Sequence, residues 1–499
     1  VEPASYSSLR AGEAGKLYYI KSSGGTSLFD TPEGSLSFFD LESREETSIL
    51  DGVSVYETNA KGTKILALSN GSWVIGDAAG KIDAGKAAIP TGSIEVLSDP
   101  RAEWAQMLRE AWRLNRDYFY DPGMHGVDWP AIWEKYKVFL PHLTTRADFT
   151  GVLQAMCGEL VVGHSYTFGG DDPSRAQRVP GGLLGADFEV HQGRYRIAKV
   201  YGGLNWNPDL RSPLTEPGVD AVAGEYLLSV NGKELRAPDN LYRHFENTSG
   251  KIVELTLASS AGGSNSRTVQ VVPITSELAL RNRDWVEGNV KRVTEATNGR
   301  VAYVWVPNTA QQGHEYFKRY FFPQSDREAI IVDERHNGGG QIADYVINIL
   351  QRPHISYWNF RYGNDLRTPQ GSIQGPKVML IDETAGSGGD LLPWMFRKFD
   401  MGTIIGRRTW GGLVGILGYP PLMDGGTVTA PNIAFFTEDG WEVENVGVAP
   451  DIEVVQWPKD QAGGRDPQLE KAIEVVMEQL EASPPQEVQR PPYPVKTKP

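Results

Sequence analysis

The sequence contains a single cysteine, Cys157, among its 499 residues. One thiol excludes an intramolecular disulfide and a zinc site built from several cysteines. The chain also lacks any uncharged apolar run of about 18 residues, which argues against a helix that crosses a bilayer. Acidic residues outnumber lysine and arginine by 63 to 49, so the formal net charge is -14. Because nucleic-acid binders depend on clustered basic residues, we expect neither nucleic acid nor membrane as a partner.

Several ligand-binding motifs are missing as well. The sequence has no HExxH or CxxC spacing, so we predict no metal site. It has neither GxxxxGK[ST] nor GxGxxG, which argues against a nucleotide site. These absences leave chemistry that the side chains and backbone of the chain can perform without a metal or an organic cofactor.

The length predicts roughly three or four domains, and the first half is mixed. Residues 1–94 hold short alternating stretches, "KLYYIKS", "SLSFFDLES" and "TKILALSNGSWVIGD", which predict antiparallel strands. They make at most one or two propeller blades, and a small β cap on the next domain is an equal alternative. Residues 95–178 predict a helical module. Its first helix starts near Ser98 and Pro100 and places on one face Trp104, Met107, Leu108 and Ala111.

The second half predicts a multidomain α+β protein. Residues 180–275 contain "EYLLSVNGKEL", whose Asn231-Gly232 pair is a strong hairpin signal. This region resembles a PDZ domain, which can add an extended peptide to a sheet edge, although a purely structural insert is the alternative. Residues 276–482 alternate strands and helices, which predicts an α/β core with mostly parallel strands. Residues 483–499 are proline-rich and predict an extended tail.

Two loops of the α/β segment carry candidate chemistry. In "VDERHNGGGQIADY" three glycines precede a helix, so backbone N–H groups there can approach an oxyanion. In "DETAGSGGD" Ser387 lies between a strand and a helix, which is close to the G-x-S-x-G elbow of α/β-hydrolases. That fold requires its histidine after the serine, whereas all eight histidines precede Ser387. Both His164 and His336 are candidate bases, although a lone loop histidine is more often structural.

Six features in one order resemble a known family. They are "CGELVVGHSYTFGGD", the PDZ-like insert, "VDERHNGGG", "DETAGSGGD", "GRRTWGGLVG" and "WEVENVGVAPDIEV". Together they look like the C-terminal half of tricorn-type serine peptidases, within the tail-specific, C-terminal-processing proteases. The resemblance covers about residues 95–485 and implies a crotonase/ClpP-like α/β catalytic core. The strand-rich start resembles the end of that family's propeller region.

The resemblance implies a role for each matching position. Ser387 would be the nucleophile and His164 its general base. The oxyanion hole would consist of Gly388 N–H and a glycine-loop N–H, for which Gly339 is the chosen position. Glu444 would belong to the hydrogen-bond relay behind the histidine. These roles agree with the chemistry, because a hydroxyl needs a positioned imidazole and the imidazole needs a fixed tautomer.

Two positions, Gly163 and Trp358, depart from the tricorn pattern, and Gly412 separates the chain from a related branch. Gly163 stands where the tricorn tetrad has a serine, so water or Ser165 bridges the histidine to Glu444, or the relay is weakened. Gly412 stands where the Ser/Lys branch carries lysine, which leaves histidine as the base. Trp358, in "ISYWNFRYG", aligns with the acidic residue that favours basic side chains, so we expect an apolar or aromatic preference instead.

The residues and the resemblance together predict a serine endopeptidase that hydrolyses peptides or unfolded polypeptides through an acyl-enzyme. The resemblance implies a homo-oligomer and a cytoplasmic location. Because the sequence begins with Val1 and shows no signal peptide, a periplasmic or secreted protein whose signal peptide has been removed is the alternative. The alternative function is a peptide-binding scaffold with a degenerate catalytic centre, built on the PDZ-like and propeller-like segments.

Overall fold

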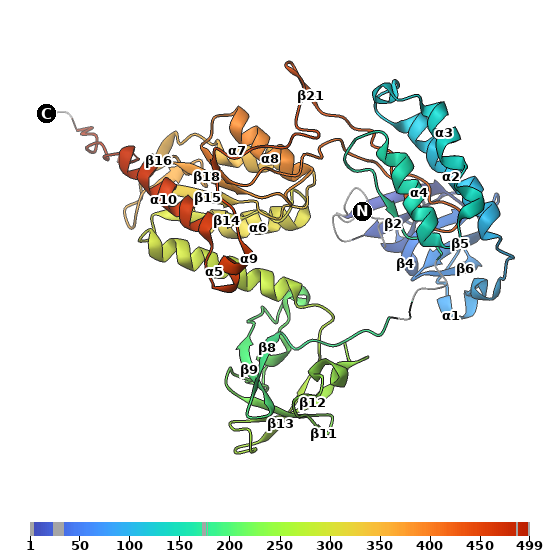
Figure 1. Cartoon of the computed structure of the whole chain (residues 1–499), viewed down its shortest axis with the longest axis horizontal. Coiled ribbons are helices and arrows are strands. Elements are labelled where there is room, and N and C mark those ends of the chain that lie inside the picture. Colours follow the sequence, from blue (N-terminus) through green and yellow to red (C-terminus); the bar gives the residue numbers. More distant parts are fainter. Residues whose placement is uncertain (1–3, 23–33, 172–175, 177, 486–487, 498–499) are drawn as a thin grey trace. The chain divides into compact units, whose positions relative to one another are not determined.

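The computed structural model describes residues 4–22, 34–171, 176, 178–485 and 488–497, and Figure 1 follows them by colour. The chain divides into two compact units. The first contains residues 1–113, 130–144 and 418–428, and the second contains residues 114–129, 145–417 and 429–499. Within the described residues, no helix is both long enough and apolar enough to cross a membrane.

The first unit contains one antiparallel sheet of six strands, and their order in the sheet follows their order in the chain. The strands are β1 (Ser5–Ala11), β2 (Lys16–Ser22), β3 (Gly34–Asp40), β4 (Glu46–Thr58), β5 (Lys64–Ser69) and β6 (Ser72–Asp77), followed by the short helix α1 (Ala84–Ala87). In β5, Ile65, Ala67 and Ser69 are buried and alternate with less buried residues, as the sequence predicted. The described strands form a single sheet, and its relation to a propeller stays a prediction.

Three helices follow in residues 95–178, as predicted. They are α2 (Pro100–Tyr118), α3 (Trp129–Lys137) and α4 (Arg146–Gly158). The four residues predicted to share one face of the first helix are all buried. Asp99 caps this helix, because its carboxylate accepts a hydrogen bond from Ala102 N–H at 3.3 Å. Thr145 and Asp148 form a capping box at the start of α4.

The PDZ-like segment is a sheet with the order β13-β12-β10-β9-β8, and β11 pairs with β10. The strands are β8 (Ala186–His191), β9 (Arg194–Val200), β10 (Tyr226–Val230), β11 (Lys233–Glu234), β12 (Val253–Ala258) and β13 (Arg267–Val271). The predicted hairpin is present, since Val230 pairs with Lys233 across Asn231 and Gly232. Both turn residues have positive φ, at 49° and 72°, as a type I′ turn requires.

The α/β core contains a parallel sheet with the order β14-β15-β18-β19-β23. The strands are β14 (Val301–Trp305), β15 (Ala329–Asp333), β18 (Lys377–Ile381), β19 (Thr403–Gly406) and β23 (Ile452–Glu453). The helices are α5 (Leu278–Ala296), α6 (Gln311–Phe321), α7 (Ala343–Leu350), α8 (Gly388–Lys398), α9 (Pro458–Ala462) and α10 (Pro467–Ala482). Figure 1 shows α7 and α8 on one face of the sheet and α5 and α10 on the other. This arrangement buries every residue of β14 and β15.

The remaining strands are short. They are β7 (Thr167–Phe168), β16 (Ser356–Trp358), β17 (Leu366–Thr368), β20 (Thr427–Val428), β21 (Phe436–Thr437) and β22 (Gly440–Trp441).

In the core, neighbouring parallel strands end at the same edge of the sheet. The glycine loop after β15 and the serine loop after β18 therefore leave the sheet side by side, which brings the two candidate motifs together.

Candidate active site

Ser387 lies on a sharp turn between β18 and α8. Its φ of 58° and ψ of -117° are unfavourable for a residue with a Cβ atom, and the glycines around it allow the chain to fold closely at this point. The side chain is half-buried at the N-terminus of α8. This geometry is that of a nucleophile elbow, in which a strained turn presents a hydroxyl beside free backbone N–H groups.

The glycine loop is packed directly against this serine. A Cβ atom placed on Gly339 would lie 2.6 Å from Ser387 Cβ and 3.1 Å from Ser387 Oγ, so only glycine fits there. Gly388 is equally crowded, because a Cβ atom on it would lie 2.8 Å from Gly340 N. The backbone of the loop therefore reaches both the nucleophile and the residue that follows it.

Asn337 joins the two loops through one hydrogen bond and fixes its own loop through three more. Its backbone oxygen accepts from Gly386 N–H at 3.1 Å, and its backbone N–H donates to the Glu334 carbonyl at 3.0 Å. Its side-chain oxygen accepts from Gly339 N–H at 2.9 Å, and its amide donates to Glu334 Oε2 at 3.3 Å. Burial, together with neighbouring negative charges, raises the pKa of Glu334 well above its usual range. In this conformation Gly339 N–H is already bonded within its own loop.

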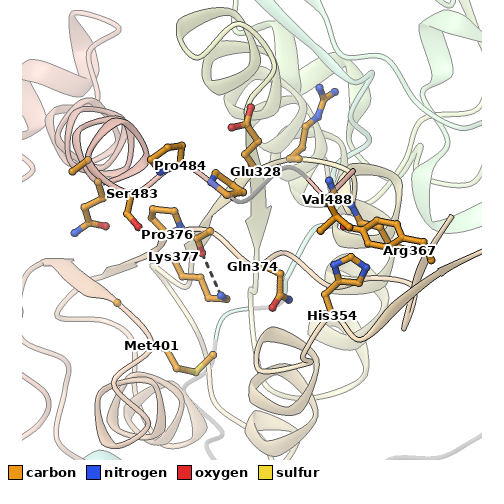
Figure 2. A pocket seen from close by; sticks show the side chains of 17 residues that line it. Glu328, His354, Arg367, Gln374, Pro376, Lys377, Met401, Ser483, Pro484 and Val488 are labelled. Carbon is orange, nitrogen blue, oxygen red and sulfur yellow. Dashed lines mark hydrogen bonds between the residues drawn. The ribbon is translucent and has the colours of Figure 1, made fainter. Parts of the chain in front are cut away.

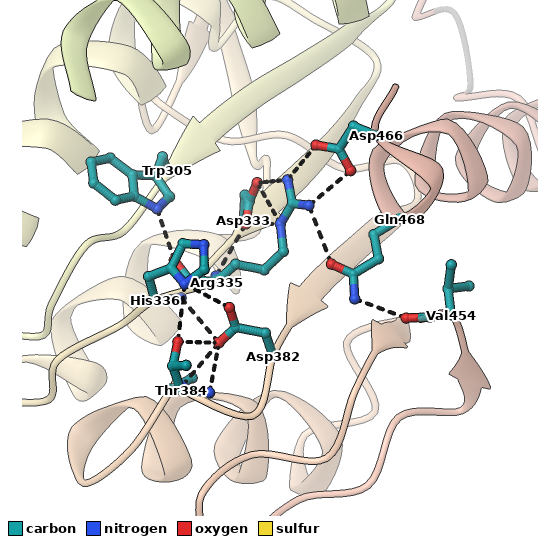
Figure 3. A network of polar contacts seen from close by, with 10 residues as sticks. Trp305, Asp333, Arg335, His336, Asp382, Thr384, Val454, Asp466 and Gln468 are labelled. Carbon is teal, nitrogen blue, oxygen red and sulfur yellow. Dashed lines mark hydrogen bonds and ion pairs between the residues drawn. The ribbon is translucent and has the colours of Figure 1, made fainter. Parts of the chain in front are cut away.

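A network of buried charges fixes the glycine loop from the other side (Figure 3). Arg335 pairs with Asp333 at 2.6 Å and with Asp466 at 2.8 Å, and all three side chains are buried. Asp466 also caps α10, and the Arg335 carbonyl accepts a hydrogen bond from Trp305 at 3.0 Å. The end of β15 is therefore tied both to α10 and to β14.

His336 joins the glycine loop to the loop that leads to the nucleophile. Its ring lies 2.8 Å from Asp382 Oδ2 and 3.0 Å from Thr384 Oγ1, as Figure 3 shows. Burial alone would raise the pKa of Asp382, but its hydrogen bonds, above all to His336, lower it to about 2. The same pair raises the pKa of His336. His336 thus contacts a carboxylate that favours its charged form, and it is not among the residues that line the pocket around Ser387.

Asp390 connects the nucleophile to the loop after β19. One carboxylate oxygen accepts from Ser387 N–H at 2.9 Å and from Gly412 N–H at 3.1 Å. The other accepts from Gly411 N–H at 2.8 Å and from the Thr409 hydroxyl. Burial raises the pKa of Asp390 although these bonds favour its charged form. The residue was not singled out from the sequence, and its signal was the S-x-x-D spacing of a capping box.

His164 faces the same pocket as Ser387. Thr429 positions its segment, because the threonine hydroxyl donates to the His164 carbonyl at 2.6 Å and accepts from Tyr166 N–H at 2.7 Å. The imidazole packs beside Trp410, with ring centroids 5.2 Å apart. Burial lowers the pKa of His164, and the charges of Glu444 and Asp390 oppose this change only partly. A neutral imidazole is therefore favoured, as a general base requires.

Glu444 lies behind His164 and binds three backbone N–H groups. Its Oε1 accepts from Gly163 N–H at 2.6 Å, and its Oε2 accepts from Leu413 and Val414 N–H at 2.7 Å each. The residues on either side of it, Val443 and Asn445, both have positive φ, so the loop is strained where it presents the carboxylate.

The backbone of Gly163, rather than a side chain, contacts the Glu444 carboxylate. A Cβ atom on Gly163 would lie 2.9 Å from Gly412 Cα and 3.1 Å from Glu444 Oε1. Gly163 and Gly412, the two glycines singled out in the sequence, are thus neighbours in space. The bridging role expected for Ser165 is not seen, because its buried hydroxyl makes no hydrogen bond within the described residues. His164 Nδ1 is likewise buried and without a partner there.

A pocket of about 350 Å³ collects most of the predicted site. It is lined by His164, Tyr166, Asn337, Gly338, Glu383, Thr384, Gly386, Ser387 and Trp410. Ser387 and His164 face this pocket without a direct hydrogen bond between them in the described structure. Trp358 is not among the lining residues; it lies on β16, 65% exposed. Trp410 and Asn337 line the pocket although neither residue was singled out from the sequence.

Comparisons with known proteins agree with this arrangement. The sequence models of three families match: Tricorn protease C1 domain over residues 100–158, Tricorn protease PDZ domain over residues 182–276, and Peptidase family S41 over residues 300–454. A solved structure, "Crystal structure of the tricorn protease", superimposes with a TM-score of 0.85 and 30% identity over 96% of this chain. Over nearly its whole length the chain is therefore similar to tricorn proteases.

Two curated relatives of the tricorn type illustrate the extent of the match. Tricorn protease homolog 1 of Streptomyces coelicolor is 34% identical over 500 residues, covering 97% of this chain and 46% of the relative. Tricorn protease of Thermoplasma acidophilum is 34% identical over 397 residues, covering 79% of this chain and 36% of the relative. The chain spans about half the length of the curated relatives it matches.

Proposed function

We propose that the chain is a serine endopeptidase that cleaves peptides or unfolded polypeptides through an acyl-enzyme, with Ser387 as nucleophile and His164 as general base. The observation that supports this best is the shared pocket. It joins a serine on a strained turn to a histidine whose neutral form is favoured by burial. A neutral imidazole can take the hydroxyl proton as the oxygen attacks a carbonyl carbon, and can return it to the leaving amine.

The oxyanion hole is assigned to Gly388 N–H and one N–H of the glycine loop. Gly388 follows the nucleophile, and the described structure holds no acceptor for its N–H. Gly339, the position chosen from the sequence, donates to Asn337 and serves only if that side chain turns away. Gly340 N–H has no acceptor within the described residues and lies beside Gly388, so it is the other candidate donor of this loop. Each donor is worth about 3 to 4 kcal/mol of transition-state stabilisation.

The relay behind the base is assigned to Glu444 acting through the backbone. The carboxylate holds Gly163 N–H and two amides of the neighbouring loop, so it fixes the backbone that carries His164. Its negative charge also favours the imidazolium that forms during attack. This arrangement replaces the serine of the tetrad with a main-chain contact.

Substrate class and assembly follow from the family. A polypeptide substrate agrees with the PDZ-like sheet, since such sheets can bind an extended strand at an edge. The apolar preference that rested on Trp358 stays a prediction, because this residue does not line the pocket. Self-association into a homo-oligomer and a cytoplasmic location are likewise proposals taken from the resemblance.

Substitution of the nucleophile tests the proposal. Ser387→Ala should abolish hydrolysis of a fluorogenic peptide and labelling by a fluorophosphonate at pH 8. Ser372→Ala is a matched control, because Ser372 donates only to the Arg352 carbonyl within the core and is not among the residues that line the pocket. Cleavage by Ser387→Ala at the wild-type rate would refute the assignment. A wild-type chain that neither cleaves nor reacts with the probe would favour the peptide-binding scaffold.

A further inference from the structure

A second cavity, of about 790 Å³, lies at the other end of the core strands (Figure 2). Glu328 directly precedes β15, Lys377 begins β18 and Gly402 directly precedes β19, and all three residues line the cavity. Because these strands are parallel, their N-terminal ends share one edge of the sheet. Ser387 follows the C-terminal end of β18, and a strand of this length spans about 16 Å. The cavity is therefore separate from the pocket around the nucleophile.

Lys377 is a half-buried cation in this cavity, and it has no anionic partner among the residues that the structure describes. Its ammonium donates to the Gly375 carbonyl at 3.3 Å, the contact drawn in Figure 2. No carboxylate within the described part of the chain lies at ion-pair distance from it. Burial lowers the pKa of Lys377, which reflects the missing counter-charge. Glu328, the acidic residue that lines the cavity, binds Arg300 through both oxygens at 2.9 Å and is already neutralised.

The other lining residues add positive charge and apolar surface. Arg367 lines the cavity and makes no ion pair among the residues that the structure describes, although its charge acts on Glu328. Pro376, Pro484 and Met401 contribute apolar surface. An occupant should therefore combine a negative group with an apolar part.

The last turn of α10 limits the charge of that occupant. Gln479, Ala482 and the following Ser483 line the cavity at the C-terminus of this helix. The carbonyl groups at a helix C-terminus carry partial negative charge, which opposes a multiply charged anion. A carboxylate, with a single charge, fits these surroundings better than a phosphate dianion.

We propose that this cavity binds the terminal carboxylate of a peptide, with Lys377 and Arg367 as its cationic partners and the apolar wall in contact with its last side chain. The carboxylate is inferred from the cavity alone. Its peptide origin rests on the proposed function, because each peptide-bond hydrolysis releases a fragment with a new terminal carboxylate. The site would then respond to product at a distance from the nucleophile.

The test measures binding with catalysis removed. In the full-length Ser387→Ala chain, titration calorimetry compares N-acetyl-Leu-Leu as the free acid with the same peptide as its carboxamide. We expect the acid to bind and the amide to bind at least about tenfold more weakly, because a charge-assisted bond is lost. Adding Lys377→Met should weaken binding of the acid by a similar factor. Lys291→Met, on α5 outside the cavity, is the matched control and should change nothing.

Three results would overturn the proposal: equal binding of acid and amide, unchanged binding after Lys377→Met, or no saturable binding of the acid at millimolar concentration. Tighter binding of inorganic phosphate than of the acid would overturn the carboxylate assignment. The unfolding midpoint of the Lys377→Met variant confirms that it is folded, since methionine keeps the length of the apolar stem. Fluorophosphonate labelling of the wild-type chain separates the two proposals. Acid binding with an inert Ser387 refutes only the peptidase, and a reactive Ser387 without acid binding refutes only the cavity.

Discussion

The exchange Glu444→Gln tests whether a carboxylate positions the base through the main chain. Its two oxygens accept hydrogen bonds from Gly163 on one side and from Leu413 and Val414 on the other. A glutamine side chain has a single oxygen, so it can accept hydrogen bonds either from Gly163 or from the two loop amides. Its NH₂ group would then face an N–H donor on the other side, and two donors cannot form a hydrogen bond. Keeping the two loop contacts sacrifices the contact to Gly163, which carries His164. One charge-assisted bond contributes about 1.5 to 3 kcal/mol, so kcat should fall roughly 10- to 150-fold.

The loss of charge also has a signature in the pH profile. Glu444 raises the pKa of His164 against the larger, opposite effect of burial. Without that charge the pKa of His164 falls further, so the acidic limb of the kcat/KM profile should move to lower pH. The maximal value of kcat/KM should fall as well, because the contact to Gly163 is lost. The assay is hydrolysis of a fluorogenic peptide across the pH range. Glu438→Gln is the control, because Glu438 is 79% exposed and contacts only Lys398. An unshifted profile with wild-type kcat in Glu444→Gln would refute the main-chain relay.

The remaining predictions concern pH and stability. Because burial lowers the pKa of His164, the acidic limb of wild-type kcat/KM should have its midpoint below about 6.5, and a midpoint above 7 would contradict His164 as base. The ion pair between His336 and Asp382 should stabilise the fold most between about pH 4 and 6.5, because the pKa of His336 is raised and that of Asp382 is lowered to about 2. This contribution disappears as acid protonates Asp382 or as rising pH deprotonates His336. In urea unfolding, the free energy of unfolding of Asp382→Asn should therefore fall furthest below that of the wild type inside this pH window. Arg335→Met leaves two buried aspartates unpaired and should cost about 3 to 5 kcal/mol of unfolding free energy, and a loss below about 1 kcal/mol would show that the network is dispensable.

Features with local causes were predictable from the sequence. The alternation in "TKILALSNGSWVIGD" and the i, i+3, i+4, i+7 face that starts at Trp104 result from geometric periods that hold wherever the segment packs. Asn231 and Gly232 tolerate positive φ, so their hairpin follows from the chemistry of the two turn residues alone. Ser387 was found for the same reason, since a strand, a glycine-flanked serine and a helix are consecutive in the chain.

Features that depend on distant partners were not predictable in this way. Gly163 and Glu444 are 281 residues apart, and no periodic pattern indicates that one binds the other. Asn337 looks like an ordinary loop residue until its contacts with Glu334 and with the serine loop are seen. The family resemblance pointed to Glu444, which the structure places beside the histidine segment, but it did not indicate that the contact runs through the main chain of Gly163.

The crowding of Gly163, Gly412 and Trp410 restricts which side chains positions 163 and 412 can carry. A side chain added at position 412 would meet the Trp410 ring at 2.3 Å, and one added at position 163 would meet Gly412 Cα at 2.9 Å. In this structure a side chain at position 412 therefore requires that Trp410 be replaced or displaced, so a lysine cannot be introduced there by a single exchange.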